Sequence, residues 1–387
     1  MTVLLVTHYY AEHRGGVERI AEEVAGRLTR RGIPVEWAAS APCDSPLPDG
    51  VTALPMTACN VTERRLGVPY PVWGPISLLR LCAAVRRCRL VHLHDCLYFG
   101  NFVAYLCARL FRKPVVVTQH IGMVPYSSRL LRGLMSLANG TLARIVLGGA
   151  SACVFYSERV RNYFRTRTGF SQPPVWIENG VAPQLFYPLS SAERHALRAR
   201  LSLPGDKPIM LFVGRFVEKK GLPILRRLAE RFPGCRWVFV GWGPDDPRRW
   251  ELSNVYCPGS LDQKELSAYY QASDLLVLLS VGEGFPLVVQ EAMACGTPAF
   301  ISDETATSLP EIERVAFISE FRNDSIFAQL EALVNDPATL ESRRAEVAEF
   351  ARRHWDWETC ADQYYRLFSE VIAEASNASG ATEPGRA

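Results

Sequence analysis

Short runs of apolar residues alternate along the chain with longer segments in which apolar positions recur every third or fourth residue. The short runs indicate strands that are buried in a parallel sheet, and the periodic segments indicate helices that place one face against that sheet. In the first half, strands are expected at residues 3–7, 35–40, 90–94, 115–118, 152–156 and 175–178. Helices are expected between them at residues 17–31, 76–89, 99–110, 129–146 and 158–167.

A second round of the same alternation follows a polar linker at residues 186–207, which carries a short helix at residues 192–201. The expected strands there lie at residues 209–213, 237–241, 275–280 and 299–302, and the expected helices at residues 222–231, 264–272, 287–295 and 340–351. Two such rounds predict an α/β protein with two doubly wound parallel sheets. We expect a first domain of residues 1–186 and a second of residues 187–356.

Two segments do not fit this alternation. Residues 42–75 are rich in proline and turn residues, and we expect little regular structure there. Residues 357–375 have the apolar periodicity of an amphipathic helix. The polar residues 376–387 that follow are expected to be disordered.

The composition is that of a globular protein. A chain of 387 residues is long enough for two domains of ordinary size, and 48% hydrophobic residues is a usual fraction for a soluble protein. There is no run of eighteen apolar residues to predict a membrane-spanning helix, and residues 1–7 are expected to form a strand rather than a signal peptide. Eleven scattered cysteines without a C-x-x-C pair indicate reduced thiols in the cytoplasm, not disulfides or a zinc site.

Charge is distributed unevenly between the two halves. Residues 1–190 hold 21 Lys and Arg against 11 Asp and Glu, a net charge of +10, and the remainder carries −7. A basic half indicates an anionic partner. Because no nucleic-acid-binding motif is present, we expect an anionic membrane surface or a lipid-diphosphate acceptor rather than nucleic acid.

Two basic and apolar helices of this half can rest on a membrane. The alternative interpretation is that they are core helices with a solvated basic face. Their cations are Arg80, Arg86, Arg87, Arg89, Arg129, Arg132 and Arg144.

The most informative polar positions lie in residues 283–291, which read E-G-F-P-L-V-V-Q-E. Glu283 and Gly284 are expected in the loop at the carboxyl end of a buried strand, where open α/β sheets bind ligands. Glu291 is expected in the following helix, on the face that points back toward the same crevice. The loop and the helix N-terminus offer N–H groups to an anion or a sugar hydroxyl. The alternative is two surface glutamates.

A second cluster of charge lies in residues 212–221, which read F-V-G-R-F-V-E-K-K-G. Arg215 and Lys220 are expected between the end of a strand and the start of a helix. A guanidinium can bind phosphate through two parallel hydrogen bonds, and an ammonium acts as a point charge. We therefore expect these residues to clamp a diphosphate. The alternative is a solvated basic turn, because Lys219 and Lys220 are adjacent.

Together these segments resemble the E-x7-E and G-R-x-x-x-x-K-G motifs of the retaining glycosyltransferases of family 4, which have the GT-B fold. The resemblance implies two Rossmann-like domains facing a cleft, the first binding the acceptor and the second the nucleotide sugar. It implies that the last helix crosses back to the first domain. It also implies transfer of a sugar from a UDP- or GDP-sugar to a hydroxyl of a saccharide or lipid-linked acceptor, with retained anomeric configuration.

The resemblance also implies roles for residues in donor binding. Arg215 and Lys220 would hold the diphosphate together with the backbone of Gly16, which lies in the motif G-G-V-E at residues 15–18. Glu291 would accept hydrogen bonds from the ribose hydroxyls. The donor sugar would be held by Glu283, Gly284, Phe285, Pro286 and Leu287.

Histidines follow two of the expected strands of the first half. His120 is expected to face the crevice, and the family often has a histidine here, near the donor sugar, where it would steady an oxocarbenium-like transition state. His94 and Asp95 end the preceding strand. They are expected either to form a carboxylate–imidazole pair that orients an acceptor hydroxyl, or to pack against the neighbouring loop.

The chain departs from the family pattern at two positions. Ala182 replaces the usual aspartate of the hinge motif at residues 179–188, so a donor contact from this loop is not carried over, although the hinge is. Trp242 replaces a small or acidic residue in the G-x-G-P turn at residues 241–244, where it lies near the base or simply packs.

No D-x-D triplet occurs, so the sequence lacks the metal–diphosphate device of the other major glycosyltransferase fold. We expect no metal or other cofactor, with Arg215 and Lys220 neutralising the leaving diphosphate. The expected role is a cytoplasmic step in cell-surface polysaccharide or glycolipid assembly. Two other functions remain open: a nucleotide-sugar epimerase or hydrolase of the same fold, and a non-catalytic partner in polysaccharide assembly.

Overall fold

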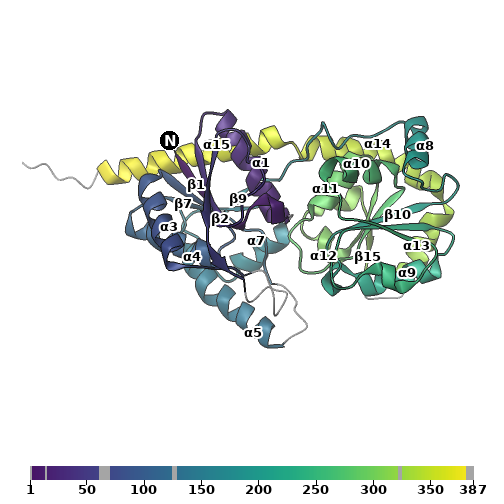
Figure 1. The fold of residues 1–387 in the computed structure, drawn as a ribbon, viewed down its shortest axis with the longest axis horizontal. Helices are drawn as coiled ribbons and strands as arrows, with labels where there is room; N and C mark the ends of the chain where they lie inside the picture. Colours follow the sequence, from purple (N-terminus) through teal and green to yellow (C-terminus); the bar gives the residue numbers. More distant parts are fainter. Residues whose placement is uncertain (1, 14, 61–69, 124–128, 321–324, 381–387) are drawn as a thin grey trace, which may run out of the picture. The chain divides into compact units, whose positions relative to one another are not determined.

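The computed structural model describes residues 2–13, 15–60, 70–123, 129–320 and 325–380. The chain divides into two compact units, each built on its own sheet (Figure 1). Unit 1 comprises Met1–Asn179 and Trp357–Ala387, and unit 2 comprises Gly180–Asp356. The division after Asn179 comes earlier in the chain than the expected boundary after residue 186, so most of the hinge motif belongs to unit 2.

The two points where the chain passes between the units lie side by side. Val181 forms a parallel bridge with Asp356, and the N–H of Val181 donates to the carbonyl of Trp355 at 3.0 Å. Residues at the start and at the end of unit 2 are therefore paired through their backbones.

The main sheet of unit 1 is parallel throughout. In the described residues its strand order is β3-β2-β1-β6-β7-β8-β9, so the order reverses at β1. The strands are β1 (Val3–Tyr9), β2 (Val35–Ser40), β3 (Val51–Met56), β6 (Leu90–His94), β7 (Val115–Thr118), β8 (Ala152–Phe155) and β9 (Val175–Trp176). Ligands of such sheets bind beyond the carboxyl ends of the strands at the point of reversal, here beyond β1 and β6.

Helices supply the apolar faces that bury this sheet. Leu81 and Val85 of α3 join a core cluster with Leu4 of β1 and Leu93 of β6, as the helical periodicity predicts. A π-helical turn, η2 (Asn139–Ala143), interrupts the helix expected at residues 129–146. The helices are α1 (Gly16–Arg30), α3 (Pro75–Arg87), α4 (Phe99–Leu110), α5 (Arg129–Ala138), α6 (Arg144–Gly149), α7 (Glu158–Arg165) and α15 (Trp357–Gly380), with the short η1 (Ala11–His13).

The expectation of little regular structure at residues 42–75 was wrong. The segment supplies the edge strand β3 and a small antiparallel pair, β4 (Ala58–Cys59) with β5 (Val72–Trp73). Only Leu54 and Met56 of β3 are buried, and Pro55 interrupts the apolar pattern, as is tolerated in an edge strand. Residues 61–69 lie outside the described residues.

Helix α15 completes unit 1. The guanidinium of Arg31, the C-cap of α1, contacts the carboxylates of Glu358 and Asp362, each at 2.8 Å. Tyr364 and Phe368 are buried, and their rings lie 5.4 Å and 5.1 Å from that of His92 on β6. The helix continues to Gly380, so residues 376–380, expected to be disordered, are helical; residues 381–387 lie outside the described residues.

The sheet of unit 2 is also parallel, with the order β12-β11-β10-β13-β14-β15 among the described residues. Strands β12 and β15 were not expected because they are short and only partly apolar, and helix α13 was not expected either. The strands are β10 (Ile209–Val213), β11 (Arg236–Val240), β12 (Val255–Gly259), β13 (Leu275–Leu278), β14 (Ala299–Ser302) and β15 (Phe317–Ser319). The helices are α8 (Ser191–Arg200), α9 (Leu222–Arg231), α10 (Gln263–Ala272), α11 (Leu287–Ala294), α12 (Asp303–Ala306), α13 (Ser325–Asn335) and α14 (Pro337–His354), with η3 (Glu218–Lys220), η4 (Pro247–Trp250) and η5 (Pro310–Arg314).

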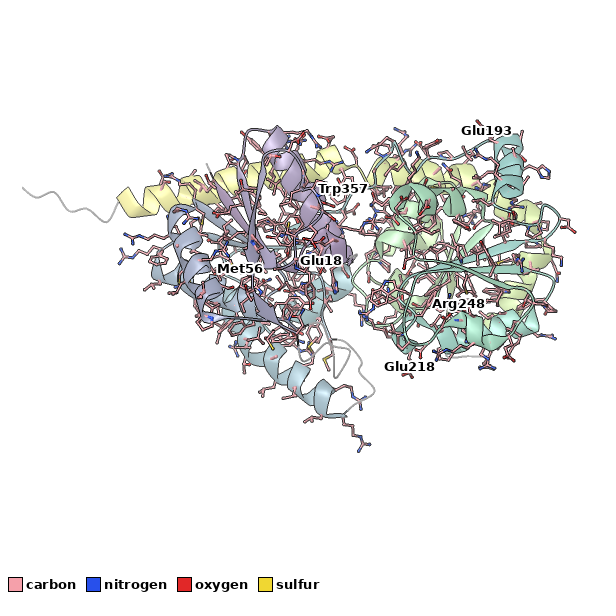
Figure 2. All side chains as sticks on the ribbon, viewed as in Figure 1. Glu18, Met56, Glu193, Glu218, Arg248 and Trp357 are labelled. Carbon is pink, nitrogen blue, oxygen red and sulfur yellow. The ribbon has the colours of Figure 1, made fainter. Side chains whose placement is uncertain are left out.

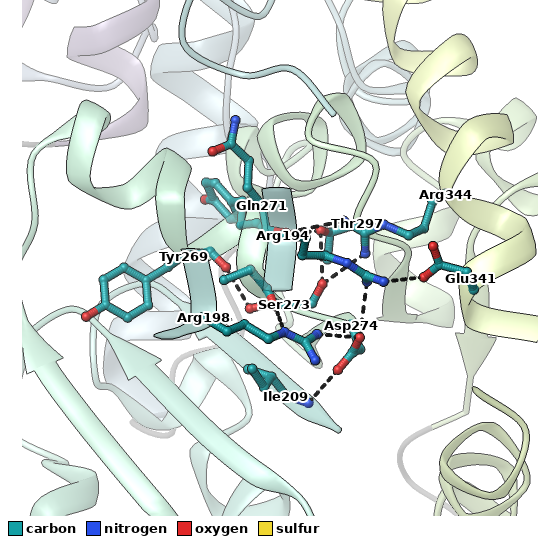
Figure 3. A network of polar contacts seen from close by, with 12 residues as sticks. Arg194, Arg198, Ile209, Tyr269, Gln271, Ser273, Asp274, Thr297, Glu341 and Arg344 are labelled. Atoms are coloured by element: carbon teal, nitrogen blue, oxygen red, sulfur yellow. Dashed lines mark hydrogen bonds and ion pairs between the residues drawn. The ribbon is translucent and has the colours of Figure 1, made fainter. Parts of the chain in front are cut away.

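A polar network fastens α8 to the amino end of this sheet (Figure 3). Asp274, directly before β13, accepts hydrogen bonds from Arg198 at 2.6 Å and from the backbone N–H of Ile209 at 2.8 Å. Arg194 contacts the same carboxylate at 3.3 Å, and Arg344 of α14 donates to a carbonyl beside it. The network lies at the end of the strands opposite the loops that carry the predicted clamp.

Candidate functional site

Arg215 and Lys220 both lie in the loop between β10 and α9, at the carboxyl end of a strand in the middle of the unit 2 sheet. Gly221 ends this loop with a φ of +81°, in the left-handed region. A Cβ atom there would lie 2.5 Å from the carbonyl oxygen of Leu279, so only glycine lets the loop approach the end of β13.

Backbone contacts join the loops that follow β10, β11 and β13. The N–H of Val281 donates to the carbonyl of Lys219 at 2.9 Å, and the N–H of Phe216 donates to the carbonyl of Trp242 at 2.7 Å. Gly241, with a φ of +145°, lies so close to the β10 loop that a Cβ atom would be 2.0 Å from a carbonyl oxygen. The two predicted motifs therefore form one connected surface of unit 2.

Glu283 forms the direct link between the two motifs. Its Oε1 lies 3.1 Å from Nζ of Lys220 and 3.8 Å from Nζ of Lys219. The side chains of Lys220 and Glu283 are only 15% and 18% exposed, so water screens their attraction less than at an open surface. The pKa of Lys219 lies below its ordinary value: Glu283, the largest single influence, raises it, but desolvation and the charges of Lys220 and Arg215 outweigh that effect.

Arg215 is the third cation of this group. Its guanidinium lies over the ring of Trp242, 4.8 Å from the centroid, and Trp242 is 45% exposed. Among the residues that the structure describes, the Nε atom of Arg215 is buried and has no hydrogen-bond partner. Trp242, which departs from the family pattern, thus places an aromatic ring against Arg215, the residue predicted to bind phosphate.

The following helix, α11, begins at Leu287 with Pro286 as its N-cap. Glu291 is 3% exposed, and its Oε2 accepts a hydrogen bond from the hydroxyl of Tyr270 at 2.9 Å, so it is not a surface glutamate. Gly284, Phe285 and Pro286 are buried, and the ring of Phe285 packs 5.7 Å from that of Trp355. Packing therefore fixes the whole segment from residue 284 to residue 291.

In unit 1, His94 and His120 end β6 and follow β7, and both are buried. Nδ1 of His94 lies 2.9 Å from Nε2 of His120, whose Nδ1 lies 2.9 Å from the hydroxyl of Tyr156. Burial lowers the pKa of His94 to about 3, and burial followed by the charge of His94 lowers the pKa of His120 well below its usual value. His120 is therefore a neutral imidazole with both ring nitrogens engaged.

Of the two alternatives for His94 and Asp95, the structure does not form the carboxylate–imidazole pair. Oδ1 of Asp95 accepts hydrogen bonds from the side-chain amide of Gln119 at 2.7 Å and from the N–H groups of His120 and Ile121 at 3.0 Å and 3.2 Å. Burial raises the pKa of Asp95 to about 6, although these N–H groups oppose the shift. The carboxylate is occupied in holding the turn after β7, which is the packing alternative.

Gly16 is exposed at the first position of α1, with Gly15 as the N-cap. Glu18, also in the first turn, folds back so closely that a Cβ atom at Gly15 would lie 1.9 Å from its Oε2. Its Oε1 lies 2.9 Å from Nε2 of His8, whose ring stacks on Tyr98 with centroids 3.8 Å apart. Burial is the largest influence on the pKa of Glu18 and raises it, but attraction to His8 and their hydrogen bond bring it below its usual value.

The predicted residues thus divide between the units: Arg215, Lys220, Glu283 and Glu291 belong to unit 2, and Gly16, His94, Asp95 and His120 to unit 1. Direct contacts join Lys220 to Glu283 and His94 to His120. His8, which lies two residues after the apolar run at residues 3–6, could have been found by a similar signal. Within the described ranges, no group of three or more His, Cys, Asp or Glu side chains is arranged to hold a metal ion. In the same part of the chain, no helix is both long enough and apolar enough to span a membrane.

Two family models together match most of the chain. Residues 14–185 match the model described as Glycosyltransferase Family 4, and residues 193–354 match Glycosyl transferases group 1. A D-inositol 3-phosphate glycosyltransferase of Catenulispora acidiphila is 28% identical over 397 aligned positions, which cover 92% of this chain and 91% of the relative.

Solved structures share the architecture of both units. Sucrose-phosphate synthase from Thermosynechococcus elongatus superposes with a TM-score of 0.79 at 21% identity, covering 97% of this chain and all of that one. HepE of Anabaena, in complex with UDP-glucose, gives a TM-score of 0.74 at 17% identity and covers 96% of this chain and 100% of its own. At these identities the likeness shows the fold.

Proposed function

This chain belongs to the glycosyltransferases of family 4 and has their GT-B fold, and on that premise we propose that it transfers a hexosyl group from a UDP- or GDP-sugar to a hydroxyl acceptor with retained anomeric configuration. The observation that carries the proposal is the cation pair Arg215 and Lys220 at the carboxyl end of β10, beside Glu283. Two fixed cations there suit the two charges of a sugar-linked diphosphate.

The donor would bind along the joined loops of unit 2. Arg215 and Lys220 take the diphosphate, and they replace a metal ion as the source of positive charge. Glu291 accepts hydrogen bonds from the ribose hydroxyls, with its second oxygen held by Tyr270. Glu283 and the N–H groups of Phe285 and Leu287 take the sugar hydroxyls.

The reaction then breaks the bond between the sugar C1 and the diphosphate oxygen. The acceptor hydroxyl attacks C1 from the face that the diphosphate leaves, which gives retention, and its proton passes to a diphosphate oxygen. Arg215 and Lys220 stabilise the charge that develops on the leaving group. In unit 1, the neutral imidazole of His120 is proposed to act beside the reacting carbon, and the backbone of Gly16 at the diphosphate.

We place this activity in cell-surface polysaccharide or glycolipid assembly, at the cytoplasmic face of a membrane. The first 190 residues carry a net charge of +10, which favours an anionic or lipid-linked acceptor, and a relative's name specifies a phosphorylated inositol. Helices α3 and α5 carry arginines, and several of their apolar side chains are more than half exposed, as a membrane-resting surface requires. These side chains are Ile76, Leu79, Leu130, Leu134 and Leu137.

The test is a binding and turnover assay in the presence of EDTA. UDP, GDP and ADP are titrated first, then their hexose conjugates are incubated with lipid-linked and free saccharide acceptors, and the product anomer is read by NMR. We expect one nucleotide series to bind without metal and donor to be consumed only with an acceptor. Binding of none would refute the donor site, and acceptor-independent consumption would indicate a hydrolase or epimerase.

A further inference from the structure

The Lys220–Glu283 ion pair places a carboxylate on the cation that the donor diphosphate needs. Nζ of Lys220 is 3.1 Å from Oε1 of Glu283, and the two side chains are 15% and 18% exposed. Nζ of Lys219 approaches the same oxygen at 3.8 Å. A diphosphate bound to Lys220 would therefore lie next to a second anion in a partly desolvated site, where like charges repel strongly.

The surrounding charges explain why an acid is present there without a ligand. Arg215, Lys219 and Lys220 bring three positive charges into one short loop against the single carboxylate of Glu218 there, and Glu283 contacts two of these cations. The loops of β10 and β13 are also joined by the bond from the N–H of Val281 to the carbonyl of Lys219. That backbone bond does not depend on charge, so the loops can stay together when the lysines change partners.

We propose that Glu283 is the resident counter-ion of the empty donor site, which the diphosphate displaces from Lys220 and which then turns to the donor sugar. This inference rests on the proposed function and adds a competition within its site. A nucleoside diphosphate without a sugar must displace the carboxylate and gives it no new partner. An intact nucleotide sugar offers its hydroxyls to the displaced carboxylate, so Glu283 discriminates donor from spent product.

Replacing a residue that binds the diphosphate weakens diphosphate binding. If Glu283 competes with the diphosphate, replacing Glu283 should instead strengthen that binding. Glu283→Gln should bind the nucleoside diphosphate about tenfold more tightly than the wild type, since one unit charge beside the phosphates is removed. The affinity for the nucleotide sugar should gain less or fall, and turnover should fall. The tenfold gain should shrink as salt rises from 0.05 M to 0.5 M.

The experiment is calorimetric titration of UDP, GDP and ADP, and of the sugar conjugate of whichever binds, into wild type and Glu283→Gln. Glu218→Gln is the matched control, because Glu218 lies exposed in the same loop and its replacement changes the net charge equally (Figure 2). Glu283→Ala repeats the test without an amide, and the melting temperature of each unliganded protein checks folding.

Tighter diphosphate binding in both Glu283 variants, with little change in Glu218→Gln, supports the competition. Equal or weaker binding in folded Glu283 variants, while the wild type binds well, would overturn it and leave the proposed function standing. A similar gain in Glu218→Gln would also overturn it, because the effect would then come from net charge alone. If the wild type binds no nucleoside diphosphate, the proposed function itself fails.

Discussion

Replacement of Lys220 by alanine should separate donor binding from folding. The substitution removes the ammonium that lies 3.1 Å from Glu283 and leaves that carboxylate with Lys219 at 3.8 Å. The loss of a hydrogen bond between charged groups costs about 1.5–3 kcal/mol. Repulsion between Glu283 and a diphosphate about 6 Å away adds roughly 1.4 kcal/mol at an effective dielectric constant of about 40.

Together these terms weaken nucleoside diphosphate binding by about 3–4 kcal/mol, or roughly 200- to 1,000-fold in Kd. Stability should change far less, because a pair that still reaches water contributes about 1 kcal/mol or less. For a unit of this size, that corresponds to a shift of roughly 2–4 °C in Tm.

The assay is calorimetric titration of the nucleotide that the wild type binds, with thermal unfolding of the same samples. Lys264→Ala, on helix α10 of the same unit, controls for the loss of one positive charge. A change in Kd below threefold in a folded Lys220→Ala protein would refute the clamp. Complete unfolding of the variant would refute the view that this pair contributes little to stability.

Three further predictions follow from the contacts described above. Trp242→Ala should weaken nucleotide binding by about 0.5–1 kcal/mol, because the ring no longer restrains the guanidinium of Arg215. Tyr256→Ala, which removes a similarly exposed ring beside Arg236, should leave the Kd unchanged in the same titration. Asp274→Asn should lower the free energy of unfolding by about 2–4 kcal/mol in urea with an unchanged nucleotide Kd, and an altered Kd would show that the network reaches the donor loops. Burial lowers the pKa values of His94 and His120 in the folded state, so their contribution to the stability of unit 1 should be complete above a pH of about 6.5 and decrease as the pH falls, because the unfolded chain binds protons first. The urea midpoints at pH 7.5 and 5.5 should therefore differ less in a variant with both histidines replaced by glutamine than in the wild type. An equal difference in the two proteins would contradict this origin.

The donor loops were predictable because their signals are local in sequence. A buried apolar run, a glycine and the cations after it mark the carboxyl end of a strand, and β10 ends at Val213 as expected. The same reasoning placed Glu283 after β13 and Glu291 in α11. What it could not give was the partner of each group, because the hydroxyl of Tyr270 reaches Glu291 from a separate helix.

Long-range pairing explains the errors in unit 1. A pair of Asp95 with His94 was one of two alternatives because the two residues are neighbours in sequence. The sequence could not decide between them, because the carboxylate bonds to the turn after β7, which is brought close only by the sheet. Strand β3 was missed because an edge strand needs few apolar residues, and its pairing with β2 supplies the stability that its own sequence does not indicate.

The place of α15 in unit 1 has a consequence for the order in which the protein can fold during translation. Its Tyr364 and Phe368 cover His92 in the interior of unit 1, yet the ribosome makes them only after the whole of unit 2. Unit 2 can therefore close as soon as it emerges, whereas the nascent unit 1 keeps an apolar seam uncovered until α15 has been made. Of the two units, the one whose synthesis begins first is thus the one that is finished last, and its exposed seam is the part of the two that chaperones would need to protect.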